Sequence, residues 1–280
     1  MTFSPEPAAS VLEAFSVDQP VFITQTTLAT IWKVTRKNQE RAALKIYHDP
    51  TIPDERAGFD LLDVWHGQGA AQLFGVRNGA ALLEWLDGPT LGDLARNGQL
   101  EQADARLVAA AVRLHETPAQ AKQDMPDLDR WCRALRRNEL PSALPEHARH
   151  IMQRARKLAD ALITEQTDVR PLHGDLHHDN IICSPRGDLA FDPKGIVGDR
   201  AYELATGFLN PVGAPETVRN PARVLRRSAM WGQAFDVAPE RLLDWAAMHV
   251  ALSAAWQLDD GRIPDFDMLH LLWAVRDGSE

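Results

Sequence analysis

Apolar and polar positions alternate over short runs in the first third of the chain, a pattern typical of strands that bury one face. Turn signals separate these runs, among them the polar segment 36–40 and Asn78-Gly79, a pair that favours tight hairpins. The sequence also predicts a leading helix at 11–17 and a second helix that opens at 53–56 and ends at Gly67. The predicted strands are 21–26, 30–35, 41–47, 71–76 and 80–85.

A helical period replaces this alternation after Leu86-Asp87-Gly88-Pro89. Ala103, Leu107 and Leu114, for example, share one face of a predicted amphipathic helix. Three short apolar runs interrupt the helical pattern and predict strands at 169–172, 181–183 and 189–191. We therefore expect an α+β fold with a sheet domain at 1–86 and a mostly helical domain at 87–280. The predicted helices are 91–95, 102–115, 128–138, 146–164, 201–209, 221–235, 239–258 and 265–276.

Length and composition are those of a globular protein, with 280 residues of which 45% are hydrophobic, enough for a sizeable core. Cys132 and Cys183 lie far apart, which indicates neither a disulfide framework nor a zinc site. The first ten residues lack the features of a signal peptide, and no run approaches the roughly 18 apolar residues of a membrane span. The net charge of −9 disfavours nucleic acid and suits a cationic substrate. We expect a cytoplasmic protein without membrane contacts.

Ionisable residues are densest in the segment from His173 to Asn180, which reads His-Gly-Asp-Leu-His-His-Asp-Asn. Predicted strands flank this segment, so a rigid scaffold can hold its side chains over a cleft. Phosphoryl transfer requires a carboxylate near the acceptor hydroxyl, oxygen ligands for Mg²⁺ and a cation on the phosphates that are not transferred. Asp175 suits the first role, and Asn180 and Asp192 offer oxygen ligands of the kind that Mg²⁺ binds.

Lys45 is the only cation within the apolar part of strand 41–47, and it suits the remaining role on the phosphates. Taken alone, it also fits an edge lysine whose stem packs on the sheet while the amine reaches water. A glutamate on the following helix would hold the ammonium group in place, and Glu55 is the candidate. Together with the loop at 173–180, this order of residues predicts a small-molecule kinase.

The order of these motifs resembles the protein-kinase-like fold, in which a small antiparallel sheet lobe faces a mostly helical lobe. His173-Gly174-Asp175 is the form found in aminoglycoside phosphotransferases, where protein kinases have His-Arg-Asp. The longer pattern adds Asp-Pro-Lys-Gly-x-x-Gly at 192–198 and Tyr-Glu-Leu-Ala at 202–205. It is similar to the streptomycin 6-kinase group, also called the aminoglycoside/hydroxyurea resistance kinase family. Further landmarks at 65–70 and 254–261 extend the resemblance over nearly the whole chain.

The resemblance implies transfer of the γ-phosphoryl group of ATP to a small-molecule hydroxyl, with streptomycin or a related aminoglycoside as the first candidate. Asp175 would orient and deprotonate that hydroxyl, and Asn180 and Asp192 would hold Mg²⁺. Lys45 would contact the α- and β-phosphates and pair with Glu55. The connection that includes Glu84 and Leu86 would offer backbone groups to the adenine base.

Two parts of the expected site have no clear motif. The segment 25–30 lacks the glycines of a kinase phosphate loop, so the resemblance suggests backbone amides and the hydroxyls of Thr26 or Thr27. For the acceptor, Asp259 and Asp260 precede a break at Gly261 and, with Glu203, would form an acidic wall. Carboxylates of this kind bind amino and guanidino groups through charge-assisted hydrogen bonds.

Three alternatives remain. A metallohydrolase would use the histidine-rich cluster, but Asp175 stands where such a loop has histidine and Asn180 would have no metal role. A pseudokinase or binding module would account for the glycine-free loop. A kinase of hydroxyurea, choline, a sugar-like acceptor or another small polyol or amino alcohol would keep the chemistry and change the substrate. The sequence leaves ATP against GTP and the oligomeric state open.

Several residues of the loop have structural interpretations. We expect His173 to prop the loop backbone and His177 and His178 to pack within the loop. Asp199 is expected to cap the segment that begins at residue 201. Lys194 fits two roles, neutralising phosphate charge or bracing the turn at Asp192, and the sequence does not choose between them.

Overall fold

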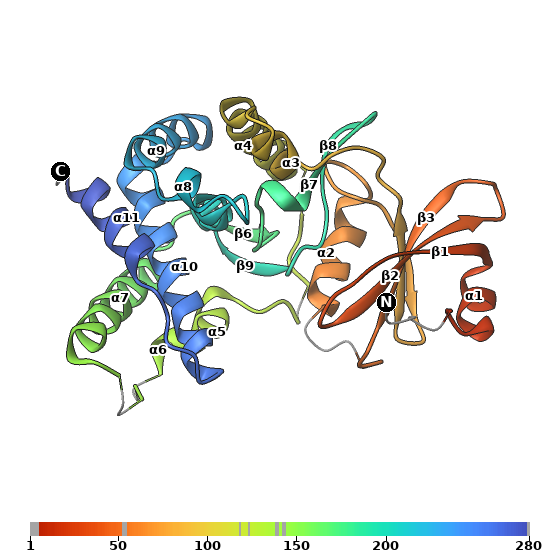
Figure 1. The fold of residues 1–280 in the computed structure, drawn as a ribbon, viewed down its shortest axis with the longest axis horizontal. Coiled ribbons are helices and arrows are strands. Elements are labelled where there is room, and N and C mark those ends of the chain that lie inside the picture. The colour runs from red at the N-terminus through yellow and green to blue at the C-terminus, as the bar shows by residue number, and fades with distance from the viewer. Residues whose placement is uncertain are drawn as a thin grey trace.

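A computed structural model describes residues 6–51, 55–117, 119–122, 124–137, 140–141 and 144–278. Its strand-rich part and its helix-rich part lie side by side along the long axis of the molecule (Figure 1). Residues 53, 54 and 138, at which we predicted a helix start and a helix end, lie outside the described residues. No helix among those that are described is long and apolar enough to cross a membrane.

The predicted strands of the first part form one antiparallel sheet in the order β1-β2-β3-β5-β4. Alternation along β3 gives the sheet two different faces. Ala42 and Leu44 point to a core that α1 covers, whereas Ala43 and Lys45 point to a cleft. These elements are α1 (Ala9–Phe15), β1 (Val17–Gln25), β2 (Ala29–Arg36), β3 (Arg41–Tyr47), α2 (Arg56–Trp65), β4 (Leu73–Arg77) and β5 (Ala80–Glu84).

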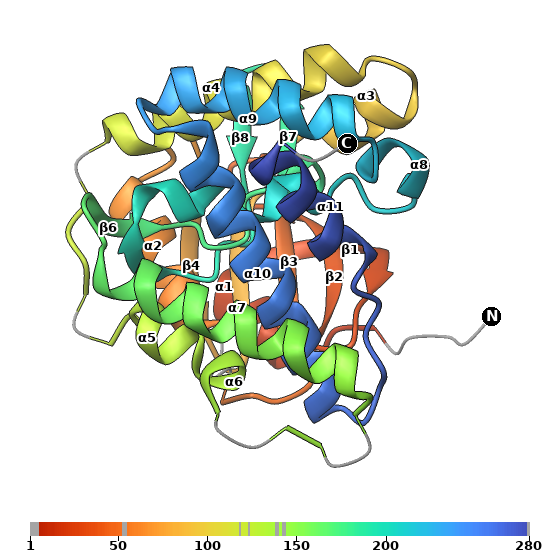
Figure 2. The ribbon, with the colours of Figure 1, turned by 90° about the vertical axis from the view of Figure 1, so that its left-hand side faces the viewer.

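Helices dominate the chain after the sheet, as the helical period of its apolar positions predicts. Figure 2 looks onto this helical part, with α7 and α10 in front of the sheet. The helices are α3 (Leu91–Arg96), α4 (Leu100–Glu116), α5 (Leu128–Trp131), α6 (Arg133–Arg136), α7 (Glu146–Thr164), α8 (Pro215–Val218), α9 (Pro221–Phe235), α10 (Pro239–Asp259) and α11 (Asp267–Asp277).

Two predicted helices are replaced by shorter elements. The segment predicted as one helix from residue 128 is divided at Cys132 into α5 and α6. The segment predicted at 201–209 consists of two 3₁₀ turns, η2 (Arg200–Leu204) and η3 (Thr206–Leu209). The side-chain oxygen of Asp199 accepts from the amide of Ala201 at 2.9 Å, which confirms the expected cap.

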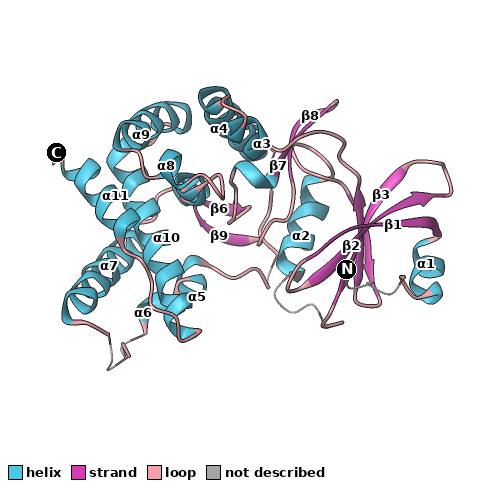
Figure 3. Ribbon diagram, viewed as in Figure 1, coloured by secondary structure: helices cyan, strands magenta, loops and turns pink. Residues whose placement is uncertain are grey.

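Four short strands lie between the sheet and the helices (Figure 3). β6 (Val169–Leu172) pairs with β9 (Ile196–Asp199), a strand that we did not predict, and β7 (Ile181–Ser184) pairs with β8 (Gly187–Ala190). The 3₁₀ turn η1 (His178–Asn180) leads directly into β7. The ionisable segment 173–180 therefore connects two strand pairs, which fixes both of its ends.

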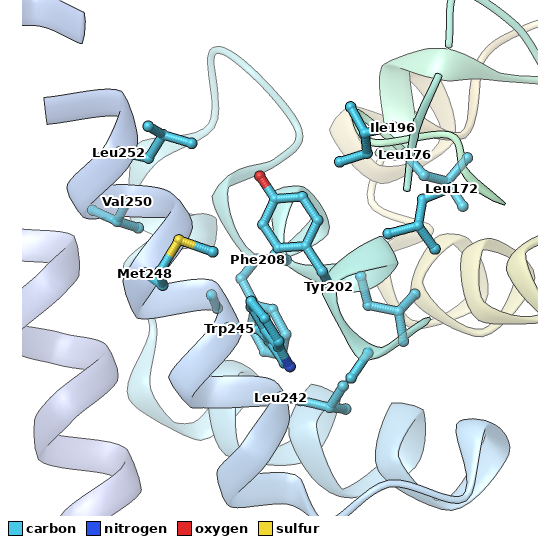
Figure 4. Close-up of a cluster of buried hydrophobic side chains, with 14 of the residues drawn as sticks. Leu172, Leu176, Ile196, Tyr202, Phe208, Leu242, Trp245, Met248, Val250 and Leu252 are labelled. Carbon is cyan, nitrogen blue, oxygen red and sulfur yellow. The ribbon is translucent and has the colours of Figure 1, made fainter. Parts of the chain in front are cut away.

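A large apolar core lies beneath this segment and anchors it. Figure 4 shows Tyr202 between Leu176, which belongs to the segment, and Met248 of α10. All three side chains are almost completely buried. Burying large side chains of this kind contributes on the order of 2 kcal/mol each, so the loop rests on a well-packed support.

Close backbone contacts join α2 to the segment that follows Asp192. A side chain at Gly58 would place its Cβ 2.0 Å from the carbonyl oxygen of Pro193, and one at Gly195 would lie 2.2 Å from that of Ala57. Gly195 also adopts a φ of +69°, in the left-handed region that favours glycine. Only glycine fits at either position without a shift of the backbone.

Candidate active site

His173 ties together the two loops that carry the predicted metal and catalytic residues. The amide of Asp175 donates to His173 Nδ1 at 3.2 Å, so the ring proton lies on Nε2. That Nε2 donates to the carbonyl of Phe191 at 2.9 Å, next to Asp192. The ring therefore fixes the spacing between the two loops, which confirms the predicted role as a prop.

Glu203 supports the same loop from below. Its carboxylate accepts from the amides of His173 at 2.9 Å and Gly174 at 3.0 Å, and from His115 Nε2 at 3.0 Å. Burial alone would raise the pKa of Glu203, but these donors outweigh burial and hold the pKa below its usual value. Because its side chain has no exposed surface, our prediction that Glu203 lines an acidic acceptor wall is wrong. The 3₁₀ turn η2 directs this side chain inwards.

Asp175 and Asn180 are joined within the loop, where Asn180 is buried and Asp175 is partly exposed. Asn180 Nδ2 donates to the backbone carbonyl of Asp175 at 2.9 Å, which turns the amide oxygen of Asn180 away from that bond. Burial raises the pKa of Asp175 to about 7, with Lys194 opposing the shift and Asp192 adding to it. A carboxyl group that titrates near neutrality suits a general base.

The paired histidines face different surroundings. His177 accepts from the amide of Asp179 through Nδ1, and its Nε2 lies 3.7 Å from a carboxylate oxygen of Asp175. Burial, with nearby His173, lowers the pKa of His177 to about 4. His178 is fully buried and bonds Asp104 at 2.8 Å. Both rings pack within the fold, in keeping with the structural interpretation of the sequence.

Lys45 lies at the meeting point of three elements. Its ammonium group donates to Glu55 at 2.9 Å, just before α2, and to Asp192 at 2.7 Å, after β8. Burial would lower the pKa of Lys45, but the two carboxylates outweigh burial and raise the pKa, so the side chain is a cation. Asp192 has a φ of +60°, a strained conformation that is common at functional sites when the surroundings hold it in place.

Glu55 binds more partners than the sequence indicated. One of its oxygens accepts from Lys45 and from the hydroxyl of Tyr47 at 3.2 Å, and the other accepts from Lys194 at 3.3 Å. We call Lys45, Glu55, Asp192 and Lys194 the cleft cluster. Nothing in the sequence marked Tyr47 for this role apart from its position two residues after Lys45 on the same strand face.

The cleft cluster lies at one end of a pocket of about 460 Å³ between the sheet and β7. Apolar side chains line the rest of it, and the predicted connection to the helical part forms one edge through Glu84 and Leu86. The carboxylate of Glu84 is held by Arg186 at 2.5 Å and 2.9 Å. Apolar walls with a few polar groups at one end are typical of a small-molecule pocket. The apolar lining includes Ile31, Ala43, Leu83, Ile182 and Phe191.

The glycine-free turn between β1 and β2 covers part of this pocket. The Thr26 hydroxyl accepts from the amides of Leu28 and Ala29 and donates to the carbonyl of Ala29, so it closes the turn. Thr27 also lines the pocket, and its carbonyl bonds His48 at 3.1 Å. The turn is thus stabilised by a hydroxyl group where other kinases use glycines.

The two aspartates predicted to bind the acceptor are exposed on the helical part. Asp259 pairs with Arg137 at 3.0 Å, and Asp260 pairs with Arg262 at 2.7 Å. Exposed pairs of this kind contribute only about 0–1 kcal/mol, so either carboxylate can exchange its arginine for another cation.

A second group of charges lies under η1 and is sealed from solvent. Asp104 of α4 accepts from His178 at 2.8 Å and from two arginines of α9, Arg223 at 2.8 Å and Arg227 at 2.6 Å. Their side chains are at most 2% exposed. We call these four residues the buried cluster. It braces η1, the turn that ends at Asn180.

The side chains of Asn180 and Asp192 carry oxygen donors, the kind of ligand that Mg²⁺ prefers. Among the residues that the structure describes, no three His, Cys, Asp or Glu side chains gather as a metal-binding group. Asn180 and Asp192 offer one amide and one carboxylate oxygen, which fits Mg²⁺ that also binds phosphate oxygens.

The kinase-like fold and this arrangement of a lysine, a glutamate, two loop aspartates and an asparagine define a small-molecule kinase. The chain matches the aminoglycoside/hydroxyurea antibiotic resistance kinase family over residues 14–261. It belongs to that family.

Named relatives agree with this assignment. The chain is 38% identical to streptomycin 3''-kinase of Klebsiella pneumoniae over 234 residues, which cover 81% of this chain and 83% of that one. It is 28% identical to streptomycin 6-kinase of Streptomyces griseus, over 81% of this chain and 74% of that one. A solved amicoumacin kinase superposes with a TM-score of 0.66 at 14% identity, covering 98% of this chain and 94% of the other, and supports the fold.

Proposed function

We propose that this kinase transfers the γ-phosphoryl group of ATP to a hydroxyl of streptomycin or a related aminoglycoside, and that it requires Mg²⁺. The proposal is supported by two linked contacts in a member of this family. Lys45 pairs with Asp192 at one end of the pocket, and Asn180, which bonds the backbone of Asp175, accepts at its carbonyl from the amide of Phe191, the residue before Asp192. Residues 1–86 form the nucleotide-binding lobe in this proposal, and residues 87–280 carry the catalytic loop and the acceptor site.

Each residue of the cleft has a defined task. Asp175 accepts the proton of the acceptor hydroxyl, and its pKa of about 7 leaves it ionised in a large fraction of molecules at neutral pH. Mg²⁺, when bound through oxygens of Asn180 and Asp192, neutralises charge on the phosphates. Lys45, held by Glu55, binds the phosphates that are not transferred.

The remaining contacts follow from the lining of the pocket. Leu86 makes no backbone hydrogen bond within the described part of the chain, so it offers the edge that binds adenine, next to Glu84, whose amide already donates to the carbonyl of Gln72 at 2.8 Å. The turn at Thr26 and Thr27 lies over the phosphates, with backbone amides and the Thr27 hydroxyl as the groups that contact them.

The acceptor is a polycation in this proposal, in keeping with a protein of net charge −9. The higher identity to a 3''-kinase than to a 6-kinase, 38% against 28%, favours the 3''-hydroxyl of streptomycin as the site of phosphorylation. Asp259 and Asp260 bind amino or guanidino groups once these replace Arg137 and Arg262.

The double variant Asp259→Asn, Asp260→Asn tests the acceptor contacts. The variant loses two charge-assisted hydrogen bonds to the acceptor, both made by exposed carboxylates. We expect KM for streptomycin to rise by about 5- to 50-fold, with kcat little changed. Steady-state kinetics measure both constants. An unchanged KM would show that these carboxylates serve only their surface arginines.

The function itself is tested by measuring ATP consumption of the purified protein with streptomycin, other aminoglycosides, hydroxyurea and small amino alcohols. We expect turnover with streptomycin, a singly phosphorylated product by mass spectrometry, and its position from phosphorus-coupled NMR. The variant Asp175→Asn, which keeps the shape of the side chain, is the matched inactive control. Turnover confined to hydroxyurea or an amino alcohol would overturn the acceptor assignment and leave the kinase assignment standing.

A further inference from the structure

Lys194 is the lysine of the cleft cluster to which the proposed roles assign no task, and the sequence left phosphate binding and bracing open for it. Its backbone amide donates to the carbonyl of His173 at 2.7 Å, which ties it to the catalytic loop. The next residue, Gly195, lies against the backbone of Ala57 in α2. Lys194 is thus clamped between the loop that carries Asp175 and the helix that follows Glu55, and its side chain lines the pocket.

The two lysines of the cleft cluster are bound unequally. Lys45 donates to two carboxylates, at 2.7 Å and 2.9 Å, and its side chain is 13% exposed. Among the residues that the structure describes, Glu55 is the single hydrogen-bond partner of the Lys194 ammonium group, at 3.3 Å, and this side chain is 25% exposed. An ammonium group has three donors. Lys194 is therefore the cation with more capacity for a ligand.

Lys194 also differs from Lys45 in the carboxylates around it. Lys45 forms its short ion pairs with Glu55 and Asp192, at the metal end of the cleft. The charge of Lys194 acts on Asp192 and also on Asp175, the residue that meets the acceptor. A phosphoryl group in transit between nucleotide and acceptor passes between those two aspartates, and its developing charge requires a fixed cation there.

We propose that Lys194 binds the phosphoryl group that is transferred, whereas Lys45 binds the phosphates that remain on the nucleotide. This assignment rests on the proposed function, since it requires ATP as the donor. In this assignment, the two lysines bind different phosphates of the triphosphate. The alternative is that Lys194 only braces Glu55 and hence Lys45.

Nucleotide binding separates the two roles without relying on turnover. The dissociation constants of ADP and of AMP-PNP, an ATP analogue that keeps a third phosphate, are measured by calorimetry with Mg²⁺ for wild type and for Lys194→Met. We expect AMP-PNP affinity to fall by about 10- to 100-fold, the effect of one charge-assisted hydrogen bond, while ADP affinity stays within about threefold. Lys194→Arg is expected to recover part of the AMP-PNP affinity.

Two matched lysine variants serve as controls. Lys45→Met is expected to weaken both nucleotides together. Lys122→Met removes a lysine that pairs with Asp60 and Asp63 of α2 away from the pocket, and is expected to change neither affinity. If Lys194→Met left the ratio of the ADP and AMP-PNP dissociation constants unchanged, the assignment would be overturned and only the bracing role would remain. A wild-type protein that bound neither nucleotide would overturn the proposed function and this assignment with it.

Discussion

The cleft cluster and the buried cluster lie near opposite ends of the same loop and differ in their exposure to water and in their charged groups. The cleft cluster balances two lysines against two carboxylates, with side chains that are 8% to 40% exposed. The buried cluster sets two arginines against one carboxylate and a histidine, all closed off from water. Lysine is a flexible point charge that can change partners, whereas the planar fork of arginine holds a carboxylate in one geometry.

The difference shows how one fold uses charge in two ways. In the buried cluster, the contacts hold η1 in position. Removal of one partner leaves an uncompensated charge in the interior. In the cleft cluster, ion pairs to Glu55 hold Lys45 and Lys194 in place, and in our proposal both lysines bind phosphates. Variants that remove one acid from each cluster should therefore fail in different ways.

Asp192→Ala is expected to have the largest effect and to act on activity alone. The variant would lose a proposed ligand of Mg²⁺, so kcat should fall by more than about 10³-fold. Lys45 keeps its pair with Glu55, so the free energy of unfolding should change by about 1 kcal/mol or less. Steady-state kinetics and urea unfolding measure the two quantities, and near-wild-type turnover would contradict the assignment of Asp192.

Asp104→Ala should show the reverse pattern. It leaves Arg223 and Arg227 buried without their shared carboxylate, which we expect to lower the free energy of unfolding by about 3–5 kcal/mol. Urea denaturation followed by tryptophan fluorescence measures this loss, and Asp259→Ala, at an exposed ion pair, is the matched control. A stability loss no larger than that of the control would show that the buried cluster is not a brace.

The smallest expected effect is a pH response that belongs to Asp175. Because the pKa of Asp175 is about 7, kcat/KM should fall about tenfold for each pH unit below 7, as the base becomes protonated. Around its carboxyl lie Lys194, Asp192, Asn180, Glu203 and His177, and the pKa of His177, at about 4, places its titration below this range.

The same pKa predicts the sign of a stability effect. The folded state holds the proton of Asp175 more tightly than the unfolded chain, whose pKa is near 3.8, so stability from this group is fully present below pH 3.8 and is lost progressively up to about pH 7. Asp175→Asn should therefore raise the melting temperature most at pH 8, and the gain should shrink towards pH 5. A gain that did not depend on pH would point to packing instead.

Residues whose role depends on neighbours in sequence were predictable, and residues whose role depends on distant packing were not. Period-two alternation located β3 and Lys45, and the bounds of β3, α7 and α9 agree with the predicted ranges. The kinase-like fold was predicted from the order of motifs. Glu203 was misplaced because a local pattern cannot tell whether a 3₁₀ turn directs a carboxylate inwards or outwards. β9 was missed because its pairing with β6 is a long-range contact.

The buried cluster could not have been predicted for the same reason. Asp104 lies in an amphipathic helix, where a charged residue is usually solvated, and its partners are 74 to 123 residues away along the chain. Only His178 carried a signal, since a histidine beside the catalytic residues that has no chemical task is expected to pack.

The contact between α2 and the segment that follows Asp192 has a consequence for control. In kinases that are switched on and off, the helix that bears the glutamate can swing outwards and break the ion pair with the strand lysine. Here Gly58 and Gly195 let the two backbones touch, so an outward swing of α2 would open this close contact with the segment that follows Asp192. The ion pair between Lys45 and Glu55 is already formed in the folded protein, so we expect it to need no activation event to assemble.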